Sequence, residues 1–307
     1  MNKKAEQILK AVNHSRVRKR LNRELNGVHH TATVDARLQP FLVPWWVTGT
    51  PHTLAYSDGL ERELWIHWYY VPRNEPRMEP YEIFHLNMLW SIGVPKAFSK
   101  VHIRIAMDGG LWIPDYLAET LDNIFGDGLD VRAVRNDSNR WELDTFCEML
   151  EYAQHTKPST ALYYTHFKGA SRVHSDNAIG FTRANDTADS VLMWCFLLYR
   201  LLFRDTDALT RGVGIGALRQ PSKVLGGKST SHNAGSFQAF TCGMTQHAAT
   251  PTTIRDTGNP WAVESYLGDN FKVEYGGDTN GMMYNVQNRK EAQVISEQMQ
   301  KYCERFI

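Results

Sequence analysis

The stretch Ala161-Leu-Tyr-Tyr-Thr-His-Phe-Lys-Gly-Ala-Ser-Arg172 decides the fold. It opens with a β-prone run and then turns polar and basic at His166, Lys168 and Arg172, with Gly169 breaking the run. Open α/β sheets bind their ligands outside the carboxyl ends of the strands. Two cations at such a strand end suit an anionic ligand, phosphate or pyrophosphate above all. An ordinary strand followed by a basic surface turn explains the same pattern, and spacing alone favours that simpler interpretation.

Upstream of this stretch, β-prone runs alternate with segments whose apolar residues recur at helical spacing. The polar cluster Arg135-Asn136-Asp137-Ser138-Asn139 predicts the N-cap region of the third helix. Strand–helix alternation is typical of a mainly parallel sheet with helices on both faces. The sequence therefore predicts an α/β protein with a Rossmann-like sheet. The expected strands cover residues 64–71, 101–107, 129–134 and 161–165, and the expected helices cover 81–92, 116–125 and 141–153.

The rest of the chain predicts additions around this core. An apolar helix is expected over 190–203, β-like segments over 212–218 and 236–242, and helices from 260 and over 289–306. Residues 1–30 carry an excess of Lys and Arg and predict short helices, followed by an irregular arm. We expect a basic N-terminal extension (1–62), a catalytic domain (63–287) and a C-terminal helix (288–307).

The composition is that of an ordinary soluble globular protein. Among 307 residues, 42% are hydrophobic and 22% are charged, which argues against disorder. The net charge of +1 gives no overall attraction to nucleic acid or membrane. The polar, basic start lacks the apolar core of a signal peptide. We expect a cytoplasmic protein, with the inner membrane face or an infected host cell as alternatives.

The cysteines indicate no metal site and no disulfide framework. Cys147, Cys195, Cys242 and Cys303 lie far apart, without metal-ligand spacing. Cys147 and Cys195 stand in apolar surroundings and are expected to be buried thiols. A reducing compartment fits this pattern.

Several short motifs fail on inspection. The loop from Ser222 to Ser229 resembles a phosphate-binding P-loop but lacks the first glycine. The glycines of residues 212–216 have the wrong spacing for a dinucleotide fingerprint. Asp205-Thr-Asp207 could hold a divalent ion, yet it follows an apolar helix and is interpreted as a solvated helix end. Asp108 and Asp137, each just past a strand, are better placed for a ligand.

Three segments resemble a group of bacterial and viral glycosyltransferases of GT-A-like fold. The first is Tyr164-Thr-His-Phe-Lys-Gly169, the second is His232 to Phe240, with an Ala-Gly-Ser-Phe core, and the third is Trp261 to Gly268. The helix start from Asn139 to Glu142 is also similar. The likeness covers residues 64–270, but Gln238 and Ala239 stand where the family has Trp-rich residues, which leaves the acceptor open.

This resemblance implies a donor site at the strand ends. Cations there could neutralise the diphosphate leaving group without a metal. Mn²⁺ or Mg²⁺ is kept as an alternative cofactor. The implied diphosphate-binding residues are His166, Lys168, Gly169 and Arg172, and the implied nucleotide- and sugar-binding residues are Tyr70, Asp108, Asn139 and Arg140.

The resemblance also implies an acceptor side. His232, Asn233 and Gly235 would line the acceptor or sugar pocket. Glu264 is the expected general base for the acceptor hydroxyl, with Asp269 second, because an inverting transfer needs one carboxylate at that hydroxyl. A surface acid on a helix is an equal alternative for Glu264.

The expected function is therefore transfer of a sugar from a nucleotide sugar, with a UDP-sugar as the favoured donor, to a hydroxyl of a glycan. A modified nucleic-acid base is a less favoured acceptor. The alternative is a non-catalytic nucleotide- or nucleic-acid-binding protein with a Rossmann-like core. The sequence does not name the sugar, the stereochemistry or the oligomeric state.

Overall fold

A computed structural model describes residues 39–42, 44–49, 51, 56–70, 78, 80–137, 139–167, 188–221, 231–233, 236–259, 261–278 and 289–305. The basic segment 1–30, the P-loop-like segment 222–229 and the residues Lys168, Gly169, Arg172 and Gly235 lie outside the described residues.

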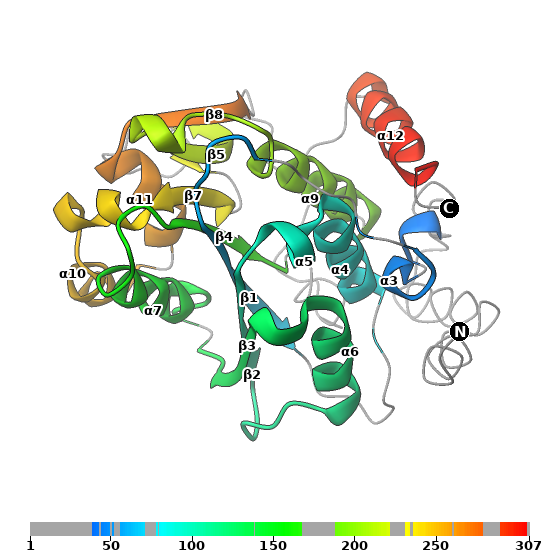
Figure 1. Cartoon of the computed structure of the whole chain (residues 1–307), viewed down its shortest axis with the longest axis horizontal. Helices are drawn as coiled ribbons and strands as arrows, with labels where there is room; N and C mark the ends of the chain where they lie inside the picture. The colour runs from blue at the N-terminus through cyan, green and yellow to red at the C-terminus, as the bar shows by residue number, and fades with distance from the viewer. Residues whose placement is uncertain are drawn as a thin grey trace.

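One twisted mixed sheet forms the centre of the molecule (Figure 1). Its order is β3-β2-β1-β4-β7-β5-β6, with β8 paired to β5. The ladders joining β3, β2, β1 and β4 are parallel, as is that of β5 with β8. Strand β7 pairs antiparallel with both β4 and β5, and β6 pairs antiparallel with β5. The strands are β1 (Arg62–Tyr70), β2 (Lys100–Met107), β3 (Leu129–Arg135), β4 (Ala161–His166), β5 (Gly214–Pro221), β6 (Ser231–Asn233), β7 (Gln238–Thr241) and β8 (Val273–Asp278).

Helices cover both faces of this sheet, as Figure 1 shows. One face carries α4 (Pro80–Ile92), α5 (Val94–Ala97), α6 (Asp115–Phe125) and α9 (Ala188–Leu202), with α12 (Arg289–Cys303) packed on α9. The other face carries α7 (Leu143–Ala153), α10 (Pro251–Asp256) and α11 (Ala262–Asn270). The predicted α/β class and Rossmann-like sheet are therefore confirmed.

Strand β1 carries buried side chains on both faces of the sheet. Its side chains alternate, because successive residues of a strand point to opposite faces. Leu64, Ile66 and Trp68 enter the core beneath α4 and α9. Trp65 faces the layer that contains α7, with less than 2% of its surface exposed. A strand buried on both faces reads as a nearly continuous apolar run, as residues 64–70 do.

Helix α7 contacts the sheet through a polar stripe as well as an apolar one. Glu142, Thr145, Glu148 and Tyr152 recur every three or four residues and so share one face of the helix. Each is bonded to a polar side chain of the sheet. We call these four residues and their sheet partners the α7 seam.

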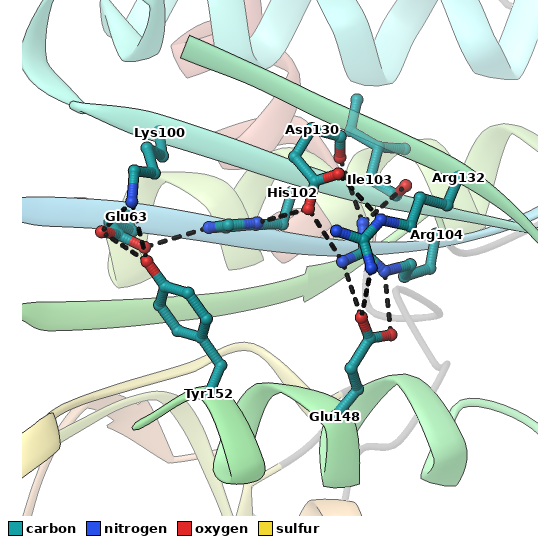
Figure 2. Close-up of polar contacts among 9 residues, drawn as sticks. All are labelled: Glu63, Lys100, His102, Ile103, Arg104, Asp130, Arg132, Glu148 and Tyr152. Atoms are coloured by element: carbon teal, nitrogen blue, oxygen red, sulfur yellow. Dashed lines mark hydrogen bonds and ion pairs between the residues drawn. The ribbon is translucent and has the colours of Figure 1, made fainter. Parts of the chain in front are cut away.

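The middle of the α7 seam is a buried charge network (Figure 2). Arg104 is 1% exposed and donates to both oxygens of Glu148 at 2.8 and 2.7 Å, and to Asp130 at 3.0 Å. His102 lies between Asp130 and Glu63, 3.0 Å from each. Every buried charge in the network therefore has an opposite charge or a hydrogen bond, as burial requires.

Helix α4 is buried on all sides and carries its own polar contacts. Asn87 accepts a hydrogen bond from the backbone N–H of Trp45 at 3.0 Å and donates to the carbonyl of Phe41. These contacts attach the short helices η1 (Gln39–Leu42) and α3 (Trp45–Thr48), whose Phe41 and Trp45 enter the core. This part of the predicted irregular arm thus packs against the hydrophobic core of the sheet and its helices.

Most expected elements occur within a few residues of their predicted bounds. The predicted N-cap region, residues 135–139, is wrong: α7 begins at Leu143 with Glu142 as its N-cap residue, and the Asp137 carboxylate instead accepts from the backbone N–H of Asn139. An Asx-type turn has taken the carboxylate that capping would use. Helix α10 and strand β8 were not predicted; β8 is short and rich in Gly.

Two further features follow from the fold. All four cysteines are free and buried, as predicted for Cys147 and Cys195. Among the residues described above, no helix combines the length and apolarity that crossing a membrane requires.

Replacing Arg104 by Met should destabilise the protein by at least about 2 kcal/mol, because removing one partner of a buried ion pair leaves the other charge uncompensated. The matched control is Arg132→Met, since Arg132 binds the same two carboxylates but is 62% exposed. Its effect should stay within about 0.5 kcal/mol. Urea unfolding measures both, and equal losses would contradict a role for buried charge.

Candidate functional site

The candidate site lies at the carboxyl ends of β1 and β4. The chain passes from β1 to β2 on one side of β1, and returns from β3 to β4 on the other side. The connections therefore diverge between β1 and β4, which makes this pair a topological switch point, where open α/β sheets bind ligands. His67 and His166 lie opposite each other in this pair.

Glu142 is the centre of the site. Its side chain is buried, and three groups bind its carboxylate. His166 Nδ1 lies 2.8 Å from Oε2, the Ser236 hydroxyl donates to Oε1 at 2.5 Å, and the Tyr164 hydroxyl donates to Oε2 at 3.2 Å. One carboxylate thus joins the start of α7, the end of β4 and the segment before β7.

These contacts keep Glu142 ionised. Burial raises the pKa of a carboxyl group, but the charge and hydrogen bond of His166 and the hydrogen bond of the Ser236 hydroxyl outweigh it. The pKa of Glu142 falls to about 2. Nδ1 of His166 is bound to this carboxylate, whereas the other ring nitrogen, Nε2, is buried and has no hydrogen-bond partner among the described residues.

Two residues at Glu142 have unusual backbone conformations. Trp141, directly before it, has a φ of 49°, and Ser236, which donates to it, has a φ of 59°. Residues other than Gly rarely adopt this left-handed region, at a cost of about 1–3 kcal/mol each. Such strain concentrates at functional sites, so both observations point to Glu142 and its surroundings.

His67 complements this centre as a neutral histidine. Its Nδ1 lies 2.9 Å from the hydroxyl of Thr145, the second residue of the α7 seam. Burial, opposed by the charge of Glu142, lowers the pKa of His67 to about 4. At neutral pH the two histidines therefore differ in environment: His166 is paired with a carboxylate and His67 with a hydroxyl.

A second polar group lies where β1, β2 and β3 end. Asp108 accepts from the Tyr69 hydroxyl at 2.5 Å and from the Asn136 amide at 2.6 Å. Burial and the bond to Asp108 raise the pKa of Tyr69 to about 12, so Tyr69 stays a donor. Tyr70 points to the opposite face, where its hydroxyl lies 2.9 Å from that of Tyr116 in α6.

Helix α11 brings the third motif to the other half of the sheet, beside β7 and β6. It packs against β6, the strand of His232 and Asn233. Buried Gln238 of β7 donates to the carbonyl of Val263 at 2.8 Å, which fixes the start of the helix. Glu264 is 5% exposed, whereas Asp269 lies exposed near the end of α11.

A pair of aromatic rings connects α7 to α11. Trp141 and Trp261 are 120 positions apart in sequence, yet their ring centroids lie 5.1 Å apart, edge to face. Next to Trp141, Arg140 pairs with Asp144 at 3.0 Å, and Asn139 lies exposed in the same turn. The Asn139–Glu142 segment and the Trp261 motif therefore meet at the surface.

The sequence missed the residues that organise the site. Glu142 and Ser236 both lie in motifs of the family resemblance but carry no predicted role, and no motif includes His67 or Tyr69. A signal existed for His67, a polar residue inside an otherwise aromatic strand. No local signal marks Ser236, because its partner is 94 residues away.

Possible metal ligands are few. Among the described residues, no three His, Cys, Asp or Glu side chains are grouped so that they could hold a metal ion. Asp207 of the Asp-x-Asp sequence is exposed and pairs with Arg211 at 3.0 Å. This arrangement fits the predicted solvated helix end.

Comparisons with known proteins add little to the structure. No protein-family model and no curated protein matches the chain. Among solved structures, a 4-diphosphocytidyl-2C-methyl-D-erythritol synthase is similar with a TM-score of 0.33 and 10% sequence identity. The match covers 78% of this chain and 97% of that one. Similarity at this level carries no functional argument.

Glu142 should make the protein acid-sensitive. Its pKa lies below the ordinary value of 4.5, so its stabilisation is complete above pH 4.5 and is lost as the pH falls toward 2. In Glu142→Gln, the free energy of unfolding should fall less over this range. His67→Asn is the control. The pKa of His67 is lowered from its ordinary value of 6.5 to about 4, so His67 affects stability between these pH values. The His67→Asn variant should therefore keep the loss of stability that Glu142 causes as the pH falls toward 2. Urea unfolding between pH 7 and 2.5 measures the free energy of unfolding of each protein. If this free energy falls as steeply with pH in Glu142→Gln as in wild type, the role of Glu142 is refuted.

Proposed function

We propose that the protein is a glycosyltransferase that moves a sugar from a nucleotide-sugar donor to an acceptor hydroxyl, on a Rossmann-like sheet of GT-A type. The proposal rests on the observation that the motif segments come together in space. The four segments on which the family resemblance rests are far apart in sequence, yet they meet around Glu142. His166 and Ser236 bind its carboxylate, and Trp261 contacts its neighbour Trp141.

The donor diphosphate is proposed to bind at His166. Its Nε2 is the ring nitrogen that Glu142 leaves for a ligand, and an imidazole held by a carboxylate is well suited to donate to a phosphate oxygen. Lys168, Gly169 and Arg172 follow directly in the sequence and would add donors and positive charge. These donors would stabilise the negative charge that develops on the leaving diphosphate. Preorganised donors of this kind lower the activation barrier of group transfer.

The nucleotide is proposed to lie toward β1, β2 and β3. Asp108, Tyr69 and Asn136 form a hydrogen-bonded group at the ends of these strands. Carboxylate and amide groups of this kind can bind the hydroxyls of a ribose. Asn139 and Arg140, in the turn after β3, would lie at the edge of the same donor site. Tyr70 would support this site from the opposite face of β1, where its hydroxyl contacts Tyr116.

Glu264 is the proposed general base. In an inverting transfer, the acceptor oxygen attacks the anomeric carbon, its proton passes to a carboxylate, and the bond to the diphosphate oxygen breaks. Glu264 is favoured over Asp269 because it is buried, and a buried carboxylate can be shifted toward the basicity that proton transfer needs. His232 and Asn233 lie on β6, against which its helix packs. They and Gly235 are the proposed acceptor contacts.

A binding protein without transfer chemistry is the second candidate function. The buried hydrogen-bonded carboxylate of Glu142 could serve binding alone, as the ion pairs of the α7 seam serve stability. Turnover separates the two candidates, since a binding protein holds the nucleotide sugar without consuming it.

Donor binding should depend on His166. We expect one family of UDP-, GDP-, CMP- or dTDP-sugars to raise the melting temperature, because a ligand at about 100 times its dissociation constant stabilises by about 2.7 kcal/mol. His166→Ala should abolish most of this shift. The control is His155→Ala, since His155 is exposed after α7. Thermal-shift assays with and without Mn²⁺ also report metal dependence; an unchanged shift in His166→Ala would rule out the diphosphate contact.

Turnover should depend on Glu264. Glu264→Gln should lower the rate of sugar transfer by about 10²–10⁴-fold, the usual contribution of a general base, while leaving the donor thermal shift intact. Asp269→Asn changes the exposed acid on the same helix and should stay within a few-fold of wild type. Release of the nucleoside diphosphate measures the rate. Equal activity of Glu264→Gln and wild type would remove Glu264 from the mechanism.

A further inference from the structure

Two tryptophans that take no part in the proposed chemistry lie exposed beside it. The side chains of Trp141 and Trp261 are 48% and 36% exposed, although they touch each other with ring planes at 81°. Burial of Trp is strongly favourable, so two exposed rings held together call for an explanation. The other exposed large hydrophobic side chains among the described residues are Leu111, Trp112 and Val294.

Trp141 is held in its position against its backbone preference. Its φ of 49° is unfavourable for a bulky residue, and the surrounding turn holds it there through hydrogen bonds from Arg140 N and Trp141 N to the carbonyl of Asp137, at 3.0 and 2.8 Å. On the partner side, Trp261 N donates to the Asn259 side chain at 3.1 Å. The turns therefore fix the backbone at both tryptophans, and the rings pack on each other; a preorganised surface binds ligands at a lower entropic cost.

The charges around the two rings are mostly negative. Residues 137–144 contain Asp137, Glu142 and Asp144 against a single Arg140, and Arg140 is paired with Asp144. Residues 255–270 contain Asp256, Glu264 and Asp269 against Arg255, which lies 3.8 Å from Asp144 and pairs with Glu151 at 2.9 Å. A nucleic acid needs cations for its phosphates, so this surface disfavours it. A neutral ligand rich in hydroxyl donors is better matched to carboxylates and amides.

We infer that Trp141 and Trp261 form an aromatic platform that binds a neutral glycan, the acceptor of the proposed transfer. The C–H face of a pyranose would pack on a ring, and its hydroxyls would donate to carboxylate or amide oxygens in the two turns. The identification of this glycan as the acceptor rests on the proposed function. The binding of a glycan to the two tryptophans does not depend on it.

The platform is placed to deliver an acceptor to the proposed base. Trp261 stands three residues, or about one helical turn, before Glu264 at the start of α11. Trp141 directly precedes Glu142, which holds His166. A glycan on the two rings therefore lies at the junction of the elements that carry the proposed base and the proposed diphosphate contact.

A protein partner fits the platform less well. Stable protein interfaces need a contiguous surface of several hundred Å² on each partner, with an apolar centre. Here, two rings are bordered by Asp137, Asn139 and Asn259, all polar. Two aromatic rings with a polar border match the size of one or two sugar units.

The test measures binding of the full-length protein to an array of neutral oligosaccharides, acidic oligosaccharides, and short single strands of DNA and RNA. Wild type should retain a subset of the neutral oligosaccharides. Trp141→Asn and Trp261→Ala should each weaken this binding about tenfold or more, the scale of losing one aromatic stacking partner. Trp112→Ala, which removes an even more exposed Trp from another loop, should have no effect.

The Asn variant separates binding from folding. Asn adopts the left-handed region readily, so Trp141→Asn should melt within about 4 °C of wild type while losing the glycan. A large loss of melting temperature would make Trp141 a packing residue and overturn the inference. Binding only to nucleic acid, binding to no neutral glycan, or glycan binding that is unchanged in both variants would overturn it as well.

Failure of the proposed function has a different signature. If no nucleotide sugar shifts the melting temperature of wild type but glycan binding depends on both tryptophans, the platform stands and the transferase proposal fails. If donors bind and turn over but the tryptophan variants transfer to the neutral glycan as wild type does, the transferase stands and the platform fails.

Discussion

Helix α7 is fixed to the sheet by a row of polar contacts, and much of the molecule depends on that row. From the amino ends of the strands to their carboxyl ends, Tyr152 binds Glu63, Glu148 binds Arg104, Thr145 binds His67 and Glu142 binds His166. Buried polar groups must be satisfied together, because a half-satisfied network costs more than an apolar contact. The register of α7 on the sheet is thereby specified, since a shift of one residue would leave charges without partners.

The same constraint places the candidate site. Because α7 cannot slide, Glu142 is delivered to the end of β4, where its carboxylate orients His166 and accepts from Ser236. This arrangement requires left-handed backbone conformations at Trp141 and Ser236, which are unfavourable for residues other than Gly. Strain on both sides of one buried carboxylate is easier to understand in a binding or catalytic centre than in a purely structural contact.

Local patterns were a good guide to the elements and a poor guide to the contacts between them. The strands from β1 to β4 were predictable, because each has β-prone apolar residues, in a run or in alternation, over six to nine residues bounded by polar turns. Strand β8 was not, because its glycines carry no apolar signal. His166 was recognised by its place after an apolar strand, but its partner Glu142 resembles any acid at the start of a helix.

The sequence by itself determined the α/β class, the alternation of strands and helices, and the strand end at which polar residues gather, because these depend on periodicity and local conformational preference. Only the tertiary structure decided that Glu142 is buried and ionised, that Ser236 and His166 share it, and that Trp141 meets Trp261. These facts depend on pairs of residues between 24 and 120 positions apart, which only the packing of layers brings together. Hydrogen bonding and burial depend on such neighbours, and no local pattern records them.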